Sequence, residues 1–305
     1  KRVPRRTDWA RRGDPIDGVM LLDKPLGMSS NAALQTVRRL VNAQKAGHTG
    51  TLDPMATGLL PLCFGNATKF SADLLHAEKG YVARVKLGEV SSTGDAEGEI
   101  VERHPVDVTA EALEEAVAAF LGEIVQIPPM YSALKVNGKC LYQLARQGET
   151  VERAPRTVTV REIAASDFDG TSFTLTCLVS KGTYIRVLAE DIGRRLGCGA
   201  HLTALRRTRV GDLSIDDAVT VETLEECGSP EEARRLLKGA DSLLQTFEAV
   251  TLDEMQTARF MTGQRLALGL TMRGRVRVYG PNNMLLGTAR ANERGVLEPE
   301  RLIAH

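Results

Sequence analysis

Residues 46–58 have the sequence Ala46-Gly47-His48-Thr49-Gly50-Thr51-Leu52-Asp53-Pro54-Met55-Ala56-Thr57-Gly58. Three glycines, three threonines and one proline break any helical or strand periodicity here, so the segment predicts a structured loop. Pro54 disfavours the α conformation for Asp53 and thereby sets a single carboxylate at a bend. His48 lies five positions before that carboxylate, and Gly50 and Gly58 permit close approach of the backbone on either side.

Two interpretations of Asp53 follow from these residues alone. In one, the carboxylate accepts neighbouring backbone N–H groups and closes an Asx turn. In the other, it is a nucleophile or base, with His48 beside it in a pocket. The residues of the loop do not decide between the two.

The charges of the chain are balanced in number but unevenly distributed. Its 305 residues include 39 basic and 39 acidic side chains, and 43% are hydrophobic, as in a globular protein with a core. Residues 135–161 carry six basic and two acidic side chains, 181–209 seven and two, and 91–118 one and eight. This pattern predicts one basic face that suits a polyanion, although ordinary solvated surface remains the alternative interpretation.

Composition also predicts the compartment. No apolar run approaches the roughly 18 residues of a membrane span, and the first residues lack the layout of a signal peptide. Residues 1–14 carry six basic and two acidic side chains and are expected to form a flexible arm. The cysteines have no C-x-x-C pair and no metal spacing, so we expect reduced core residues in a cytoplasmic protein without a bound metal. They are Cys63, Cys140, Cys177, Cys198 and Cys227.

Hydrophobic periodicity predicts the elements around the loop. Residues 18–22 and 172–180 are predicted strands, and residues 81–87 alternate so that Tyr81 shares the apolar face. Residues 185–196 predict an amphipathic helix that ends at a glycine, and Ser29 or Ser30 is expected to cap an earlier helix. Arg186 falls in the first turn of its helix, where the dipole disfavours a cation and an acidic partner is expected.

Residues 47–58 closely resemble the catalytic motif of the TruB family of tRNA pseudouridine synthases. Four further stretches match the family in the same order, and together they cover nearly the whole chain. They are Asp23-Lys24-Pro25-Leu26-Gly27-Met28-Ser29-Ser30, residues 126–135, Gly182-Thr183-Tyr184-Ile185-Arg186 and residues 199–207.

The resemblance implies an α+β protein with the pseudouridine synthase fold, in which a mixed, mainly antiparallel central sheet is flanked by helices and loops. Residues 15–246 would form the catalytic domain, with an insertion at about 126–156 that grips the T-loop of tRNA. Residues 247–305 would form a small β-rich, PUA-like RNA-binding domain, and alternating residues at 275–278 and 285–289 agree with a β module.

The resemblance also assigns roles to individual residues. Asp53 would be the catalytic carboxylate, and Arg186 beside it would keep it ionised. Tyr81 would stack on the target uracil, His48 would fill the space that the flipped base leaves or stack on its neighbours, and Leu205 would line the pocket. Tyr184, which lies in the matching stretch 182–186 that carries Arg186, would also bind the substrate. The candidate RNA-contacting residues are Lys24, Lys69, Lys135, Arg146, Arg206 and Arg207.

The reaction implied is the isomerisation of uridine 55 to pseudouridine in the tRNA T-loop. The uracil is flipped out, Asp53 initiates cleavage of its bond to C1′, and the base reattaches through C5. Attack at C1′, addition at C6 and removal of a proton from C2′ all remain open. Because nothing is oxidised and the sequence has no P-loop or dinucleotide fingerprint, we expect no cofactor. The expected partner is the T-stem-loop of tRNA, for a monomer without an obligate protein partner.

Other functions remain as alternatives. One is a guide-RNA-dependent pseudouridine synthase that works with partner proteins, and another is a non-catalytic RNA-binding protein or RNA chaperone. A glycosidase or phosphotransferase that uses Asp53 is a third, but a glycosidase needs a second carboxylate and none stands out. The acidic segment 91–107 is expected to lie away from the RNA.

Overall fold

The central sheet begins at the apolar run predicted as a strand at residues 18–22. The computed structural model describes residues 12–132 and 134–303, so the arm predicted at 1–14 lies almost entirely outside the described residues. Within them, a nine-stranded sheet has the order β1-β3-β12-β4-β11-β10-β7, with β2 on β3 and β13 on β12. The β3–β12 pair is parallel and its other pairs are antiparallel. The strands are β1 Gly18–Lys24, β2 Ala46–His48, β3 Ala56–Phe64, β4 Lys79–Leu87, β7 Gly122–Gln126, β10 Arg156–Ser166, β11 Ser172–Val179, β12 Ala200–Val210 and β13 Leu213–Ser214.

The helices begin and end where their capping residues predict. Ser29 caps the first helix by accepting the backbone N–H of Ala32 at 3.1 Å, and Gly197 ends the helix that carries Arg186 with φ of 82°. In the described residues, no helix is both long and apolar enough to cross a bilayer. The helices of this part are α2 Ser30–Leu40, α3 Ala110–Ala118, α4 Leu141–Arg146, α5 Ile185–Leu196, α6 Val221–Glu226 and α7 Pro230–Arg234, with the 3-10 helices η1 Gly65–His76, η2 Ile215–Asp217 and η3 Ala240–Leu243.

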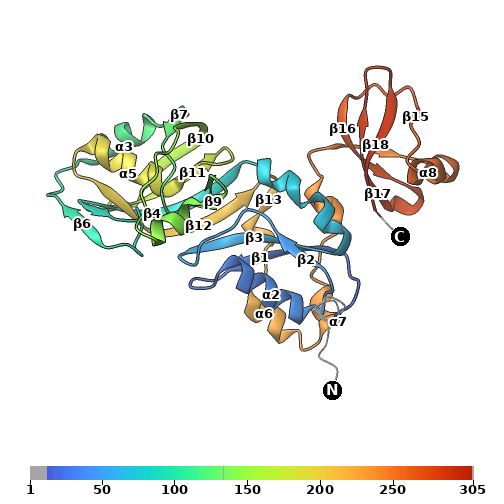
Figure 1. Cartoon of the computed structure of the whole chain (residues 1–305), viewed down its shortest axis with the longest axis horizontal. Helices are drawn as coiled ribbons and strands as arrows, with labels where there is room; N and C mark the ends of the chain where they lie inside the picture. The colour runs from blue at the N-terminus through green and yellow to red at the C-terminus, as the bar shows by residue number, and fades with distance from the viewer. Residues whose placement is uncertain (1–11, 133, 304–305) are drawn as a thin grey trace.

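The sheet has two halves with separate cores. Helices α2 and α6 lie against β1 and β3, whereas α3 and α5 lie against β4, β11 and β10 (Figure 1). Met55 and Leu205 pack against both cores. The two halves therefore meet at β3, β12 and β4, and the loop that carries Asp53 enters β3 at this junction.

A second sheet forms the C-terminal part of the chain (Figure 1). Its strands have the order β14-β16-β17-β18-β15 and enclose a core that includes the fully buried Phe260. Three polar contacts hold it to η1: Arg275 pairs with Asp73 at 2.5 Å, the Lys69 ammonium donates to the carbonyl of Leu302 at 2.8 Å, and Arg301 donates to the carbonyl of Lys69 at 2.9 Å. The elements are β14 Glu248–Thr251, α8 Glu254–Met261, β15 Leu266–Ala267, β16 Gly274–Tyr279, η4 Pro281–Asn283, β17 Leu285–Ala291 and β18 Val296–Leu302.

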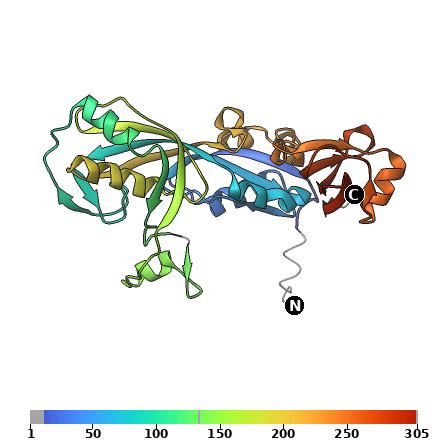
Figure 2. The same cartoon turned by 90° about the horizontal axis from the view of Figure 1, so that it is seen from above.

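Two small hairpins extend from the central sheet. Strands β5 Glu89–Ser91 and β6 Ile100–Arg103 form one, which overlaps the start of the acidic segment. The other pairs β8 Lys135–Val136 with β9 Lys139–Cys140 and continues into α4. Figure 2 shows that the second hairpin and α4 project away from the sheet between β7 and β10. The projecting unit falls inside the predicted insertion at about 126–156.

Candidate active site

The Asp53 loop is fixed at both ends while its carboxylate stays open to solvent. Ser30 at the start of α2 both donates to the carbonyl of Leu52 at 2.7 Å and accepts its N–H at 2.8 Å. The carbonyl of Pro54 accepts the N–H of Gly27 at 2.7 Å. The Asp53 side chain is 58% exposed, and within the described residues it accepts no backbone N–H, so the Asx-turn interpretation is wrong.

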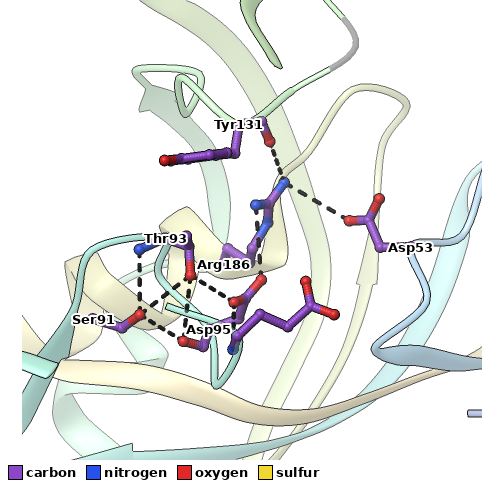
Figure 3. A network of polar contacts seen from close by, with 7 residues as sticks. Asp53, Ser91, Thr93, Asp95, Tyr131 and Arg186 are labelled. Atoms are coloured by element: carbon purple, nitrogen blue, oxygen red, sulfur yellow. Dashed lines mark hydrogen bonds and ion pairs between the residues drawn. The ribbon is translucent and has the colours of Figure 1, made fainter. Parts of the chain in front are cut away.

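Arg186 faces Asp53 from the first turn of α5. Its Nη2 lies 3.9 Å from Asp53 Oδ2 and donates to the carbonyl of Tyr131 at 2.6 Å, and its Nη1 lies 3.8 Å from Asp95 Oδ2 (Figure 3). The arginine side chain is only 13% exposed. The helix dipole disfavours a cation at the position of Arg186, and two carboxylates and a carbonyl offset this effect, as predicted.

Asp95 brings the acidic segment 91–107, which is expected to lie away from the RNA, next to Arg186. Its side chain is 4% exposed, and its Oδ1 accepts from Thr93 Oγ1 at 2.6 Å and from the N–H of Glu97 at 3.0 Å (Figure 3). These bonds satisfy one carboxylate oxygen and leave the other beside Arg186. The turn Ser92-Thr93-Gly94-Asp95 was the available sequence signal, but it is indistinguishable from other acidic turns nearby.

The half-buried Tyr81 and the fully buried Arg207 lie opposite each other at the junction of the two half-sheets. Arg207 is 1% exposed, and its guanidinium donates to the carbonyls of Leu59 at 2.9 Å and Gly50 at 2.7 Å. It also hydrogen-bonds the phenol of Tyr81, whose pKa is raised by burial against the opposing effect of Arg207. This burial corrects the expectation that Arg207 contacts RNA: its charge stabilises the Asp53 loop and Tyr81 from inside.

His48 ends β2 and is neutral near pH 7. Burial, followed by the charge of Arg207, lowers the pKa of the imidazole from its ordinary value of 6.5. Its Nδ1 is buried and has no hydrogen-bond partner among the described residues. An uncharged ring suits contact with a base better than contact with a phosphate.

Comparison with known proteins identifies this arrangement. Three family profiles match in succession: the TruB family pseudouridylate synthase N-terminal domain at residues 38–185, the tRNA pseudouridylate synthase B C-terminal domain at 186–245, and the pseudouridine synthase II TruB C-terminal domain at 249–303. The tRNA pseudouridine synthase B of Burkholderia mallei (strain ATCC 23344) is 55% identical over 310 residues, 99% of this chain and 98% of that protein. That of Cupriavidus metallidurans is 54% identical, over 99% of this chain and 96% of the relative.

The chain belongs to the TruB family of pseudouridylate synthases. It is accordingly an enzyme, a pseudouridine synthase. Solved structures agree with the fold: an H/ACA ribonucleoprotein bound to a substrate RNA containing 2′-deoxyuridine matches with a TM-score of 0.72 at 26% identity, over 94% of this chain and 85% of that chain. A Cbf5-Nop10-Gar1 complex matches with a TM-score of 0.71 at 26% identity, over 93% and 84%.

Two further residues predicted to bind the substrate of this TruB enzyme occupy framework positions. Leu205 is opposite Ala56 of β3 and Ala83 of β4, so it lies between the two half-sheets. Tyr184 precedes α5, and its backbone N–H and C=O both pair with the side-chain amide of Gln126, at 2.9 and 3.1 Å. The buried Gln126 thereby fixes the start of the helix that carries Arg186.

Most candidate RNA-contacting residues of this TruB chain have partners within the protein. Lys24 is 0% exposed and donates to the carbonyls of Pro25 and Met28 at 2.8 and 2.6 Å, which corrects its proposed RNA contact. Lys69 is engaged by the C-terminal sheet, and Arg206 is bound by both oxygens of Asp23, at 2.9 and 2.8 Å.

The two remaining candidates lie in the segment at about 126–156 that was predicted to be an insertion. Arg146 stacks over the ring of Tyr142 at 4.2 Å. Lys135 belongs to β8, although its side chain is not among the parts that the structure describes. Across the described ranges 12–132 and 134–303, no group of three or more His, Cys, Asp or Glu residues is placed to hold a metal ion.

Proposed function

We propose that this enzyme converts uridine 55 in the T-loop of tRNA to pseudouridine. The observation that carries the proposal is the exposed Asp53 carboxylate on a fixed bend with the Arg186 guanidinium 3.9 Å away. The curated relatives named above are tRNA pseudouridine synthases and are similar over nearly the full chain. The T-loop as the target follows from the residue-by-residue match at 47–58 and 182–186.

Asp53 initiates the reaction as an ionised carboxylate. The bond between N1 and C1′ breaks, a bond between C5 and C1′ forms, and the proton that C5 gives up is balanced by one gained at N1. The substrate and product therefore have the same atoms and oxidation state. Asp53 acts by attack at C1′, by addition at C6 or by removal of the C2′ proton, and Arg186 holds it in place in each case.

The target base reaches Asp53 only after it leaves the folded loop, at a cost of a few kcal/mol. Tyr81 offers a flat face on which the extruded uracil stacks, and Arg207 holds its phenol from behind. Leu205 closes the apolar side of the pocket. The neutral ring of His48 occupies the gap or stacks on the neighbouring bases.

The two peripheral units bind the rest of the RNA. The insertion at about 126–156 grips the T-loop with its basic and aromatic residues, and its Tyr131 carbonyl contacts Arg186, which links that grip to the reacting site. Residues 247–305 act as the PUA-like RNA-binding domain, behind a catalytic domain at 15–246.

The alternative functions have less support. Cbf5 structures share 26% identity with this chain, against 55% for the stand-alone tRNA enzyme, which argues against a guide-RNA-dependent role. Asp95 is a second carboxylate near Asp53, yet it is 4% exposed and turned to Arg186, so it is poorly placed as the acid of a glycosidase. An exposed Asp53 beside an intact Tyr81 and Arg186 also disfavours a non-catalytic chaperone.

Incubation with an unmodified tRNA transcript, followed by mapping of pseudouridine, tests the proposal. Product at position 55 is expected, and Asp53→Asn should abolish turnover while it changes the dissociation constant for tRNA less than about threefold, because the amide keeps the shape of the carboxylate. Product at another position, or retained turnover in the purified variant, overturns the assignment.

A further inference from the structure

A group of cations without carboxylate partners borders the Asp53 loop. Lys79 begins β4, and its Cε lies 3.6 Å from where a Cβ on Gly50 would be, while Arg207 Nη1 lies 3.3 Å from the same point. Gly50 precedes Asp53 by three residues. Lys181, between β11 and α5, places its ammonium 2.9 Å from Nδ1 of His76. Positive charge therefore approaches the loop from β4 and β12, and the charge of Lys181 acts on Lys79.

These cations lack the compensation that the other basic residues of the site have. Arg186 has two carboxylates, Arg206 has Asp23, and Arg161 pairs with Glu78, the residue directly before Lys79. By contrast, no ion pair within the described residues involves Lys79, Lys181 or Arg207. Among the described residues, the one hydrogen-bond acceptor of the Lys79 ammonium is the carbonyl of Ala77, at 3.0 Å.

The lack of a counterion affects the charge of Lys79 in the free protein. Burial, followed by the neighbouring charges of Arg207 and Lys181, lowers its pKa from 10.5 to about 8. A half-buried lysine held among other cations is unfavourable unless an anion joins them. No carboxylate of the described chain meets that need, so an external anion is the natural partner.

We propose that Lys79 and Lys181 bind the phosphodiester adjacent to the reacting uridine, with the buried Arg207 as a fixed positive charge behind them. The inference rests on the proposed function, because it names the part of the RNA that the same site holds. C1′ must meet Asp53, and a phosphate is joined to the same ribose, so the phosphate must lie near the loop. Ammonium groups are common phosphate ligands, and such contacts fix the position of a strand rather than its sequence.

The site makes RNA affinity depend on pH. The charges that act on Lys79 are Arg207 from β12 and Lys181 from the segment before α5. The other titratable groups nearby are Glu78, which precedes Lys79 in the chain, Tyr81, which is two residues further along β4, and His76 of η1, which contacts Lys181. Arg207 stays charged and Tyr81 stays neutral between about pH 7 and about pH 9, and Arg161 holds Glu78. A bound phosphate favours charged Lys79 and raises its pKa, so affinity falls as the pH rises above about 8, by up to about tenfold per pH unit.

Binding of a fluorescent T-arm RNA to the full-length chain tests this dependence. An Asp53→Asn background prevents turnover, and Asp53 is not among the charges that shift Lys79. We expect the dissociation constant of this parent to rise several-fold between about pH 7 and about pH 9. Lys79→Arg should bind well at both values, whereas Lys79→Gln should bind about tenfold more weakly at pH 7 with little further change. Lys86→Gln, on the same strand but paired with Glu89, is the matched control and should keep the parental slope.

A second measurement identifies the phosphate. Replacing each phosphate that flanks the target uridine with a neutral methylphosphonate should weaken binding to the parent at one position and leave Lys79→Gln unaffected there. The phosphate site is overturned if the dissociation constant changes equally with pH in the parent, Lys79→Arg and Lys79→Gln. It is also overturned if each methylphosphonate weakens binding equally in the parent and in Lys79→Gln. Absence of pseudouridine from the unsubstituted enzyme would instead overturn the proposed function, so the two failures are distinguishable.

Discussion

Replacing Asp95 with asparagine tests how one guanidinium serves two carboxylates. Arg186 lies 3.8 Å from Asp95 and 3.9 Å from Asp53, so neither carboxylate holds it alone. At an effective dielectric constant of roughly 20, a pair of charges at 3.8 Å interacts by about 4 kcal/mol. The asparagine keeps a polar contact in place of the charge, and a hydrogen bond to a charged group is worth about 2 kcal/mol. The net loss of interaction energy between residue 95 and Arg186 is therefore about 2 kcal/mol.

A loss of about 2 kcal/mol in the transition state corresponds to roughly a 30-fold slower reaction. We expect the single-turnover rate of Asp95→Asn to fall by about that factor, because Arg186 shifts toward Asp53 and no longer holds it in the reacting geometry. The dissociation constant for tRNA should change little, since Asp95 is buried away from solvent. Rapid-quench measurement with saturating enzyme separates the two quantities.

Asp107→Asn provides the control for this experiment. Asp107 belongs to the same acidic segment but is exposed, and no ion pair among the described residues involves it. Its substitution should leave the single-turnover rate unchanged. A rate for Asp95→Asn within about twofold of the parent, in a protein that melts normally, would refute the idea that Asp95 positions Arg186.

Three further predictions concern backbone strain, a buried histidine and the contact between the two sheets. Gly58→Ala should lower the free energy of unfolding by about 2–4 kcal/mol in urea denaturation, because φ is +106° and the new Cβ would lie 2.2 Å from the carbonyl oxygen of Arg207. The control Gly182→Ala has open space around the new Cβ and should cost only about 1 kcal/mol. Equal losses in the two variants would contradict this reasoning. His48 has a lowered pKa in the folded protein, so the unfolded chain binds a proton at this imidazole more readily. The contribution of neutral His48 to stability is therefore complete above about pH 6.5 and is lost as the pH falls below that value. An NMR titration midpoint above 6.5 for His48 would contradict the burial argument. Arg275→Met leaves Asp73 and Glu300 without their shared partner, so limited proteolysis between the two sheets should be faster than in the parent, and an unchanged rate would show that the apolar contacts suffice.

The sequence alone determined the local features of this protein. The bend around Asp53, the cap at Ser29, the helix at 185–196 with its glycine stop and the alternation of 81–87 all depend on neighbouring residues. The predicted loop was too long at both ends, because residues 46–48 form β2 and residues 56–58 begin β3, where pairing with distant strands overrides the local pattern. The unfavourable helix position of Arg186 even predicted an acidic partner. Such features are accessible because periodicity and capping act over only a few residues.

Only the tertiary structure decided which charged residues are buried and which of them meet. Strand β12 was not predicted, and its parallel pairing with β3 joins Arg207 to Gly58 across about 150 residues of chain. That pairing buries Arg207, whereas the neighbouring Arg206 remains half-exposed beside Asp23. Asp95 likewise reaches Arg186 through a long-range contact with β12 at Leu202. A sequence shows that a residue is charged, but its environment is set by distant strands that pack around it, because burial and counterions arise only when those strands come together.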